Sequence, residues 1–314
     1  MTAPVKSMVR VHTLTGNLLW ETTLAVLSLE AGRTHRAKSM SFQVGGKGVN
    51  VSKMLTRLGA PTTALFFPGG ATGAECERWV ASQGIESRAF PLKAPGRVGL
   101  VVRPQGRPDT TFLGPDTPVE AEAALDCARY LDRCPPDEAL AVCGSIPGWD
   151  TPACEPIRAA IRRWIKRGPV LADTYGPPLE WMAKLPLSWV KLNRVEFDGL
   201  FPDGERGKPL PERLSAVLER WPAKAWVVTD GPNPVWFVER GRPPGRLVPP
   251  GVDEVSPTGS GDVLHACLLH AVLNCGRSLD EALALALPYA AANAAHPAVA
   301  DFPMDRLPPI IWKG

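Results

Sequence analysis

Short apolar segments alternate along the chain with longer segments that have a helix-like pattern. The short segments are predicted to be strands, at 62–67, 139–143, 170–173, 189–192 and 226–229. The longer segments are predicted to be helices, at 49–58, 75–82, 121–131, 153–167, 211–221, 262–274 and 279–295. Four of the helices are followed by a glycine that is expected to cap them, at Gly59, Gly84, Gly168 and Gly276. The alternation predicts an α/β fold with a mostly parallel central sheet and helices on both faces.

Two regions depart from this alternation. Residues from about 9 to 44 and from about 96 to 114 carry extended stretches of mixed polar and apolar residues, and 106–108 has the composition of a hairpin turn. Such inserted segments predict a small antiparallel lid, with the active site between lid and sheet, beyond the carboxyl ends of the strands. No internal repeat or low-complexity linker occurs; the length suggests two domains, and one large α/β domain over residues 1–314 fits equally well.

The composition is that of a folded protein with little charge bias. Hydrophobic residues make up 45% of the chain, which is ample for a buried core. The net charge of +3 is too small to indicate nucleic acid or a membrane surface as a partner. The apolar stretch at 24–29 is too short to span a bilayer, and the pattern of a signal peptide is absent. The seven cysteines form no CxxC pair, so we expect reduced thiols in a cytoplasmic protein.

The first candidate motif is Val-Gly-Gly-Lys-Gly-Val-Asn-Val at 44–51, which leads into a predicted helix. Glycine lets the backbone approach a ligand closely, and a helix start offers N–H groups without partners. Lys47 adds a positive charge. The spacing is not that of a Walker A loop, and a flexible turn before a helix is the alternative interpretation.

The second candidate motif is Ser-Pro-Thr-Gly-Ser-Gly-Asp at 256–262, ahead of an apolar helix. Gly259 and Gly261 permit a tight turn whose N–H groups can face a transferring phosphoryl group. Asp262 is placed to accept a proton from a substrate hydroxyl. The alternative is an aspartate that only caps the helix.

A third motif, Lys-Leu-Asn-Arg-Val-Glu at 191–196, follows a predicted strand. Asn193 and Glu196 match a capping box, which is a purely structural role. Alternatively, their oxygens hold water around Mg²⁺ or phosphate. Weaker signals also follow strands, at 144–148, 173–174 and 229–231, where each could be an ordinary turn.

Taken in order, these motifs resemble the PfkB (ribokinase-like) family of carbohydrate kinases, over residues from about 9 to 297. The resemblance implies a three-layer α/β/α fold with a small β-sheet lid. It also implies phosphoryl transfer from ATP, with Mg²⁺, to a hydroxyl of a sugar or sugar phosphate. Lids of related proteins pair edge to edge, so the resemblance further implies a homodimer through the lid.

The resemblance also assigns roles to individual residues. Asp262 would be the base, and the N–H groups of Gly259, Ser260 and Gly261 would form the anion hole. Residues near the nucleotide and the metal would be Lys191, Asn193, Glu196, Thr229, Gly231 and Asn293. Among these, Asn193 and Glu196 would position Mg²⁺ through water or phosphate. Residues facing the sugar would be Gly46, Lys47 and Asn50.

Within the family the chain looks most similar to 1-phosphofructokinases and tagatose-6-phosphate kinases. Arg97, ahead of a lid strand, would grip a substrate phosphate; the alternative is an exposed lid residue. One departure concerns the aspartate near the N-terminus that binds sugar hydroxyls in that branch. Leu19 falls at or near its place, with Asn17 and Glu21 as imperfect substitutes and Trp20 as a candidate for stacking on a ring.

Two other functions stay open at this stage. The altered segment at 13–20 is compatible with a non-catalytic protein that binds sugars or nucleotides on a kinase scaffold. A kinase of the same fold that acts on a nucleoside or a vitamin-like alcohol is the other. The intact turn at 258–262 favours an active kinase.

Overall fold

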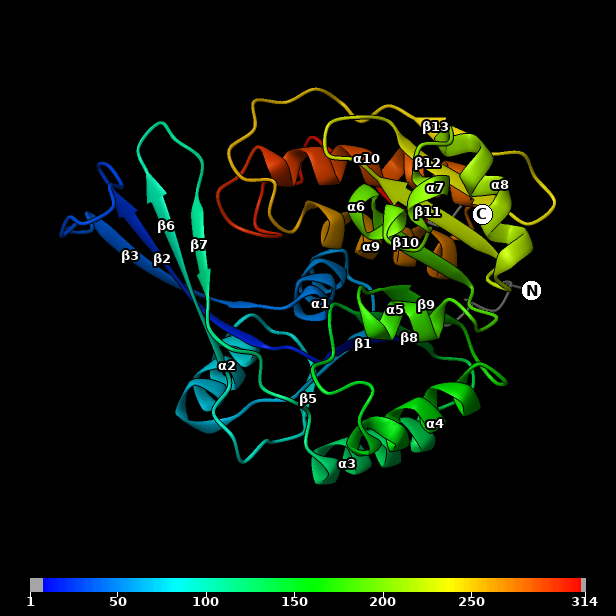
Figure 1. Ribbon diagram of the computed structural model, residues 1–314, viewed down its shortest axis with the longest axis horizontal. Coiled ribbons are helices and arrows are strands. Elements are labelled where there is room, and N and C mark those ends of the chain that lie inside the picture. Colours follow the sequence, from blue (N-terminus) through cyan, green and yellow to red (C-terminus); the bar gives the residue numbers. More distant parts are fainter. Residues whose placement is uncertain (1–7, 312–314) are drawn as a thin grey trace, which may run out of the picture.

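Two β-sheets organise the chain, for which the computed structural model describes residues 8–311 (Figure 1). The larger sheet has nine strands in the order β13-β12-β11-β10-β9-β8-β1-β4-β5. Their bounds are β1 Val11–Thr15, β4 Thr62–Phe66, β5 Ser87–Ala89, β8 Ala139–Cys143, β9 Val170–Asp173, β10 Trp189–Asn193, β11 Ala225–Thr229, β12 Val235–Glu239 and β13 Gly245–Leu247. In this order, neighbouring strands from β5 to β11 pair in parallel, whereas β11 with β12 and β12 with β13 pair antiparallel. The predicted mostly parallel sheet is thereby confirmed.

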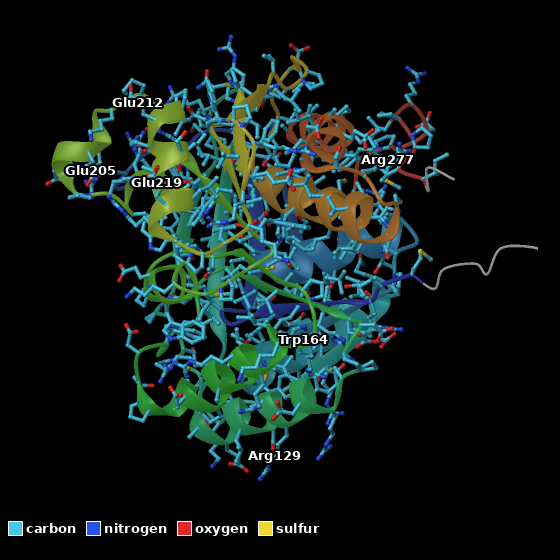
Figure 2. The ribbon with its side chains drawn as sticks, turned by 90° about the vertical axis from the view of Figure 1, so that its right-hand side faces the viewer. Arg129, Trp164, Glu205, Glu212, Glu219 and Arg277 are labelled. Atoms are coloured by element: carbon cyan, nitrogen blue, oxygen red, sulfur yellow. The ribbon has the colours of Figure 1, made fainter. Side chains whose placement is uncertain are left out.

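Helices cover both faces of this sheet. Their bounds are α1 Lys47–Arg57, α2 Gly70–Ser82, α3 Ala121–Arg133, α4 Glu155–Trp164, α5 Pro177–Met182, α6 Arg194–Asp198, α7 Asp203–Arg206, α8 Leu210–Arg220, α9 Ser260–Leu269 and α10 Leu279–Ala294. In β8, Leu140 and Val142 pack into the core with α3 and α4, whereas Ala141 packs into the core with α9 and α10. Figure 2 shows Trp164 inside the molecule, where it is 1% exposed, and Arg129 at the surface. Because both faces are buried, the architecture has three layers.

A separate four-stranded sheet forms the lid, which projects from the body of the molecule (Figure 1). Its order is β3-β2-β6-β7, with bounds β2 Leu19–Val26, β3 Ser39–Gly45, β6 Arg97–Pro104 and β7 Thr110–Leu113. The hairpin predicted at 106–108 joins β6 to β7, and Gly106 has a φ of 70° there. The lid is not wholly antiparallel as predicted, because β2 and β6 pair in parallel.

The predicted start of the first lid segment, at about residue 9, is wrong, because residues 11–15 form a central strand of the large sheet. The polar composition of this strand hides it from a pattern search. Thr13 is buried, and its hydroxyl lies 2.8 Å from that of Ser52. His12 is also buried, and its Nε2 lies 2.6 Å from Oε2 of Glu138. Thr13 and His12 therefore each have a partner that compensates for their removal from water.

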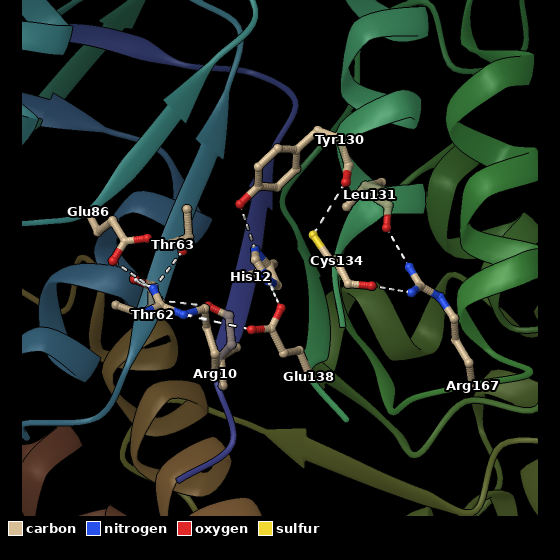
Figure 3. A network of polar contacts seen from close by, with 11 residues as sticks. Arg10, His12, Thr62, Thr63, Glu86, Tyr130, Leu131, Cys134, Glu138 and Arg167 are labelled. Carbon is tan, nitrogen blue, oxygen red and sulfur yellow. Dashed lines mark hydrogen bonds and ion pairs between the residues drawn. The ribbon is translucent and has the colours of Figure 1, made fainter. Parts of the chain in front are cut away.

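Figure 3 shows the polar network around His12, at the start of β1. The hydroxyl of Tyr130, on α3, lies 3.4 Å from Nδ1 of His12, and Arg10 forms an ion pair of 2.7 Å with Glu86. Burial lowers the pKa of His12 below its usual value, although Glu138 acts in the opposite direction. The network joins β1 to α3 and to the segment before β8, at the end of the strand away from the lid.

Several predicted boundaries differ in the structure. The helix predicted at 75–82 begins at Gly70, and the one at 153–167 opens with a 3₁₀ turn and ends at Trp164. The helix predicted at 262–274 continues past Leu269 as a π-helical turn. Of the four predicted glycine caps, Gly168 lacks a positive φ. It is needed for space, because a Cβ there would lie 2.6 Å from the carbonyl oxygen of Glu138.

Among the described residues, no helix is both long enough and apolar enough to cross a membrane. All seven cysteines are buried and unpaired, as the sequence predicts.

Candidate active site

A cavity of about 610 Å³ lies between the lid and the carboxyl ends of the strands in the large sheet. The lid contributes Leu19, Glu21, Gln43 and Arg97 to its lining, and the strand ends contribute Thr15, Cys143, Lys191, Asn193 and Thr229. This is the position predicted from the sequence. In a parallel sheet the carboxyl ends of neighbouring strands meet at one edge, which brings residues distant in sequence together.

Most of the predicted site residues line this cavity. They are Gly46, Lys47, Asn50, Arg97, Lys191, Asn193, Thr229, Gly231, Gly259, Ser260, Gly261 and Asp262. Glu196 and Asn293 are not part of the lining, and both contact residues that are.

The turn at 258–262 requires its glycines for two reasons. Gly259 has a φ of 76°, and a Cβ there would lie 2.2 Å from Cγ1 of Val299. A Cβ on Gly261 would lie 2.7 Å from Nζ of Lys191. The N–H of Ser260 donates to the carbonyl of Pro257 at 3.2 Å, so it is partly committed within the turn. The start of α9 nevertheless presents N–H groups that have no acceptor inside the helix.

Asp262 lies on the first turn of α9 and is 6% exposed. Its Oδ2 accepts a hydrogen bond of 2.7 Å from Nδ2 of Asn50, on α1. Burial and the neighbouring Asp173 raise the pKa of Asp262 to about 6, against the opposing effects of Lys47 and Lys191. A carboxylate with this pKa can gain and lose a proton near neutral pH, as a general base must.

Beneath the cavity lies a cluster of opposite charges that centres on Asp173, which is fully buried. Its two oxygens bind Nζ of Lys47 at 3.0 Å and Nζ of Lys191 at 2.8 Å. Lys47 also lies 3.1 Å from Glu196. Burial alone would raise the pKa of Asp173, but the two lysines hold it well below its usual value. Burial likewise opposes the charge of Lys47, whose pKa the carboxylates nevertheless raise.

This cluster changes the interpretation of two residues. Lys47 lines the cavity as predicted, but its ammonium group is bound to Asp173 and Glu196. Asp173 was only a weak signal in the sequence, because a single aspartate after a strand is typical of an ordinary turn. The signal that could have identified it is its place at the end of a fully buried strand.

The capping box predicted at Asn193 and Glu196 is present. The N–H of Glu196 donates to Oδ1 of Asn193, and the N–H of Asn193 donates to Oε2 of Glu196, each at 2.9 Å. Both side chains therefore have a structural role at the start of α6, and Glu196 additionally binds Lys47.

Asn293 lies behind the glycine turn. It is fully buried, and its Nδ2 donates to the carbonyl of Thr258 at 2.9 Å and to Oγ of Ser260 at 3.0 Å. Its Oδ1 accepts from the N–H of Ala300 at 2.8 Å. Because its amide is committed to these contacts, Asn293 supports the turn, and its expected place near the adenine stays a prediction.

The lid side of the cavity contains polar residues around Arg97. Nε of Arg97 donates to the carbonyl of Gly114 at 3.2 Å, and Nη1 lies 3.2 Å from Oδ1 of Asp116. Asn17 donates to the same Oδ1 at 2.9 Å and to Oγ of Ser145 at 3.1 Å. No sequence motif indicates Asp116, which follows β7 in an irregular segment.

The residues near the place of the missing aspartate differ in whether they reach the cavity. Leu19 and Glu21 line the cavity, and Gln43 donates a hydrogen bond to Glu21. Trp20 is not part of the lining; it packs on Phe42 at 5.2 Å between ring centroids and donates to Glu75 at 2.7 Å. Trp20 thus has a packing role in the lid.

Comparisons with known proteins agree with this arrangement. A family model described as pfkB family carbohydrate kinase matches residues 14–305. A 1-phosphofructokinase from Borreliella burgdorferi is 26% identical over 275 residues, which cover 86% of this chain and 87% of the relative. Phosphofructokinase-2 from Escherichia coli, in complex with fructose-6-phosphate, superposes with a TM-score of 0.81 at 22% identity over 91% of this chain and 94% of that one. Ribokinase from Thermotoga maritima superposes with a TM-score of 0.72 at 17% identity over 95% and 96%.

Proposed function

The chain belongs to the pfkB family of carbohydrate kinases, and from this premise we propose that Asp262 is the base that activates the acceptor hydroxyl. The observation that carries the proposal is the position of its carboxylate. It lies in the cavity beside the glycine turn, almost out of water, with Asn50 as a donor. A base in such a place is ready to accept the proton of a hydroxyl that attacks a phosphoryl group at the turn.

The kinase family implies ATP as the phosphoryl donor, and the chemistry of the lining supports this. The part of the cavity formed by β12, α9, α10 and the segment before α9 is largely apolar, as a planar base requires. Its residues include Val235, Val252, Leu264, Leu287, Ala290 and Ala291. The polar turn at 258–261 adjoins this part and would face the phosphates, with Thr229 and Gly231 beside the nucleotide.

Mg²⁺ is proposed as the second cofactor, bound through water. The carboxylates of Asp173 and Glu196 already bind Lys47 and Lys191. Their oxygens are therefore better suited to bind the water molecules around Mg²⁺ than to coordinate the ion directly. Asn193 and Glu196 would orient that water. The ion supplies charge that offsets the phosphates of ATP during the transfer.

The proposed acceptor is a sugar phosphate, in keeping with the 1-phosphofructokinase relative and the phosphofructokinase-2 neighbour. Arg97 lines the cavity on the lid side, where its guanidinium could bind the phosphate of the acceptor. Leu19 stands where a hydroxyl-binding aspartate would be expected, so other polar groups of the lining would contact the sugar, with Glu21 and Asn17 on the lid side and Asn50 on α1.

In the proposed mechanism the residues position the reactants and shield them from water. Asn50 orients Asp262, which accepts the proton of the attacking hydroxyl. The N–H groups at the start of α9 face the phosphoryl group as it moves. Lid residues close over the acceptor and exclude water, which would otherwise compete as an acceptor.

The test is a coupled assay of ADP release with Mg-ATP and a panel of phosphosugars, free sugars and nucleosides. We expect turnover on a phosphosugar, and a loss of about 10²–10⁴-fold in Asp262→Asn with ATP binding retained. Asp126→Asn, which changes an exposed carboxylate on α3, is the matched control. Near-normal turnover in Asp262→Asn would refute the assignment of the base. ATP binding without turnover on any acceptor would favour a binding protein instead.

A further inference from the structure

Asp116 occupies an unusual position at the junction of lid and body. Its Oδ1 is bound by two cavity residues at once, Nη1 of Arg97 at 3.2 Å and Nδ2 of Asn17 at 2.9 Å. A guanidinium and an amide that converge on one anionic oxygen are the contacts that an oxygen of a bound phosphate would receive. The carboxylate therefore resembles a bound anion that the chain itself provides.

The other cations in the cavity lining are committed elsewhere. Lys47 binds Asp173 and Glu196, and Lys191 binds Asp173. Of the cations that line the cavity in the described part of the chain, this leaves Arg97 for a phosphate on the acceptor. Arg97 uses Nε for the carbonyl of Gly114, so its Nη edge is the one that a phosphate would share with Asp116.

We propose that Asp116 stands in for the phosphate of the acceptor and weakens the binding of phosphates in the cavity by competing for Arg97. This rests on the proposed function, because it assumes that the acceptor phosphate binds at Arg97. When a phosphosugar enters, its phosphate replaces the carboxylate, and Asp116 turns toward solvent. The exchange is feasible because the Asp116 side chain is 52% exposed and can move without burying its charge, whereas Arg97 is 16% exposed and stays in place.

The competition has a consequence for other anions. While Asp116 neutralises Arg97, the lid side of the cavity offers little net attraction to a small anion such as inorganic phosphate. A phosphosugar overcomes this because its sugar makes further contacts in the cavity. The pair therefore weakens the binding of both by a similar factor, and only the phosphosugar has sugar contacts that compensate for the loss.

The decisive variant is Asp116→Asn, which keeps the size of the side chain and removes its charge. The ion pair is partly exposed, so its loss should lower the KM for a phosphosugar about twofold to fivefold with little change in kcat. Inhibition by inorganic phosphate should strengthen by a similar factor, and both effects should shrink at high ionic strength. A KM that rises instead would overturn the proposal, since Asp116 would then be a ligand of the sugar. No change in either constant would overturn it as well.

Asp109→Asn is the matched control. Asp109 forms a bidentate pair with Arg103 on the same lid, at 3.0 Å to Nε and 2.8 Å to Nη2, and neither residue is part of the cavity lining. Removal of this charge should leave the KM and the phosphate inhibition unchanged. If Asp109→Asn changes the KM and the phosphate inhibition as much as Asp116→Asn does, the effect comes from the general loss of negative charge on the lid. That result would overturn the proposal.

Calorimetric binding of inorganic phosphate to the protein without ATP separates the two proposals. Tighter binding to Asp116→Asn than to the wild type, abolished by the further change Arg97→Met, would support the competition even if no phosphosugar is turned over. In that case the acceptor would not be a phosphosugar, and the competition between Asp116 and phosphate for Arg97 would still hold. Equal binding by all variants would overturn the inference whatever the acceptor.

Discussion

The carboxylate of Asp262 lies next to Asp173 and is almost out of water, and both conditions work against its charge. In the folded protein its pKa is about 6, above the ordinary value of 3.8. Between these pH values the folded protein binds a proton that the unfolded chain does not. Stability therefore falls as the pH rises through this window, and at neutral pH the ionised group is a net cost to the fold.

Asp262→Asn is accordingly expected to stabilise the protein while it removes activity. A shift of this size corresponds to about 1–3 kcal/mol of unfolding free energy at pH 7.5, with little difference from the wild type near pH 4. Chemical denaturation of both proteins at the two pH values measures this. A variant that is less stable than the wild type at pH 7.5 would contradict the prediction, since the ionised carboxylate would then favour the folded state.

At the scale of residues, the sequence located the turn at 258–262 and the segment at 44–51 in the cavity lining. It did not locate the partners that define their chemistry. The link between Lys47 and Asp173 joins residues 126 positions apart, so it depends on the order of strands in the sheet. The sequence of 293–300 likewise gives no sign that Asn293 supports the turn from behind.

At the scale of elements, α1 is tied to the segment that supports the glycine turn. Lys53 donates to the carbonyl of Val299 at 3.0 Å, and Arg57 donates to the carbonyl of Ala300 at 2.8 Å. Val299 in turn packs directly on Gly259, where a Cβ would lie 2.2 Å from it. One end of α1 thus carries Lys47 and Asn50 into the cavity, and the rest of the helix supports the turn that faces them.

We expect Lys53→Met to weaken this link without touching the reactants. A hydrogen bond from a charged group is worth about 1.5–3 kcal/mol, so the unfolding free energy should fall by about that amount. Because Lys53 positions the turn, kcat should fall severalfold more than the KM changes, and Lys53→Arg should restore part of kcat. Lys224→Met, at an exposed position before β11, is the control. A folded Lys53→Met variant with normal kcat would show that the link serves stability alone.

The elements that the sequence missed have physical reasons in common. β1 is buried but polar, because Thr13 and His12 find partners on α1 and beside β8. The parallel pairing of β2 with β6 joins residues 78 positions apart, and local patterns do not reveal a partner at that distance. By contrast, long helices such as α10 were predicted because their apolar residues repeat within the element itself.

At the scale of the whole molecule, the register of the lid separates its two faces. Glu21 and Gln43 are paired across β2 and β3 and face the cavity. The next row, Phe42, Thr22, Leu100 and Phe112, points the other way, as does the row of Met40, Leu24, Val102 and Thr110. The outer face is therefore largely apolar, and Met40 and Phe112 are 73% and 55% exposed on it. An apolar sheet face of this kind is unusual on a surface that stays in water.

We propose that a second copy of the chain covers this face, and we expect a homodimer through the lid. The variant Met40→Asp/Phe112→Asp would place two like charges in the interface of each copy. Because both side chains are exposed in the single chain, the monomer should still fold, and sedimentation velocity should show half the mass of the wild type. Leu125→Asp, at an exposed apolar position on α3, should leave the mass unchanged. A wild type that sediments as a monomer at micromolar concentration, or a doubly substituted variant that stays dimeric, would place the contact elsewhere or exclude it.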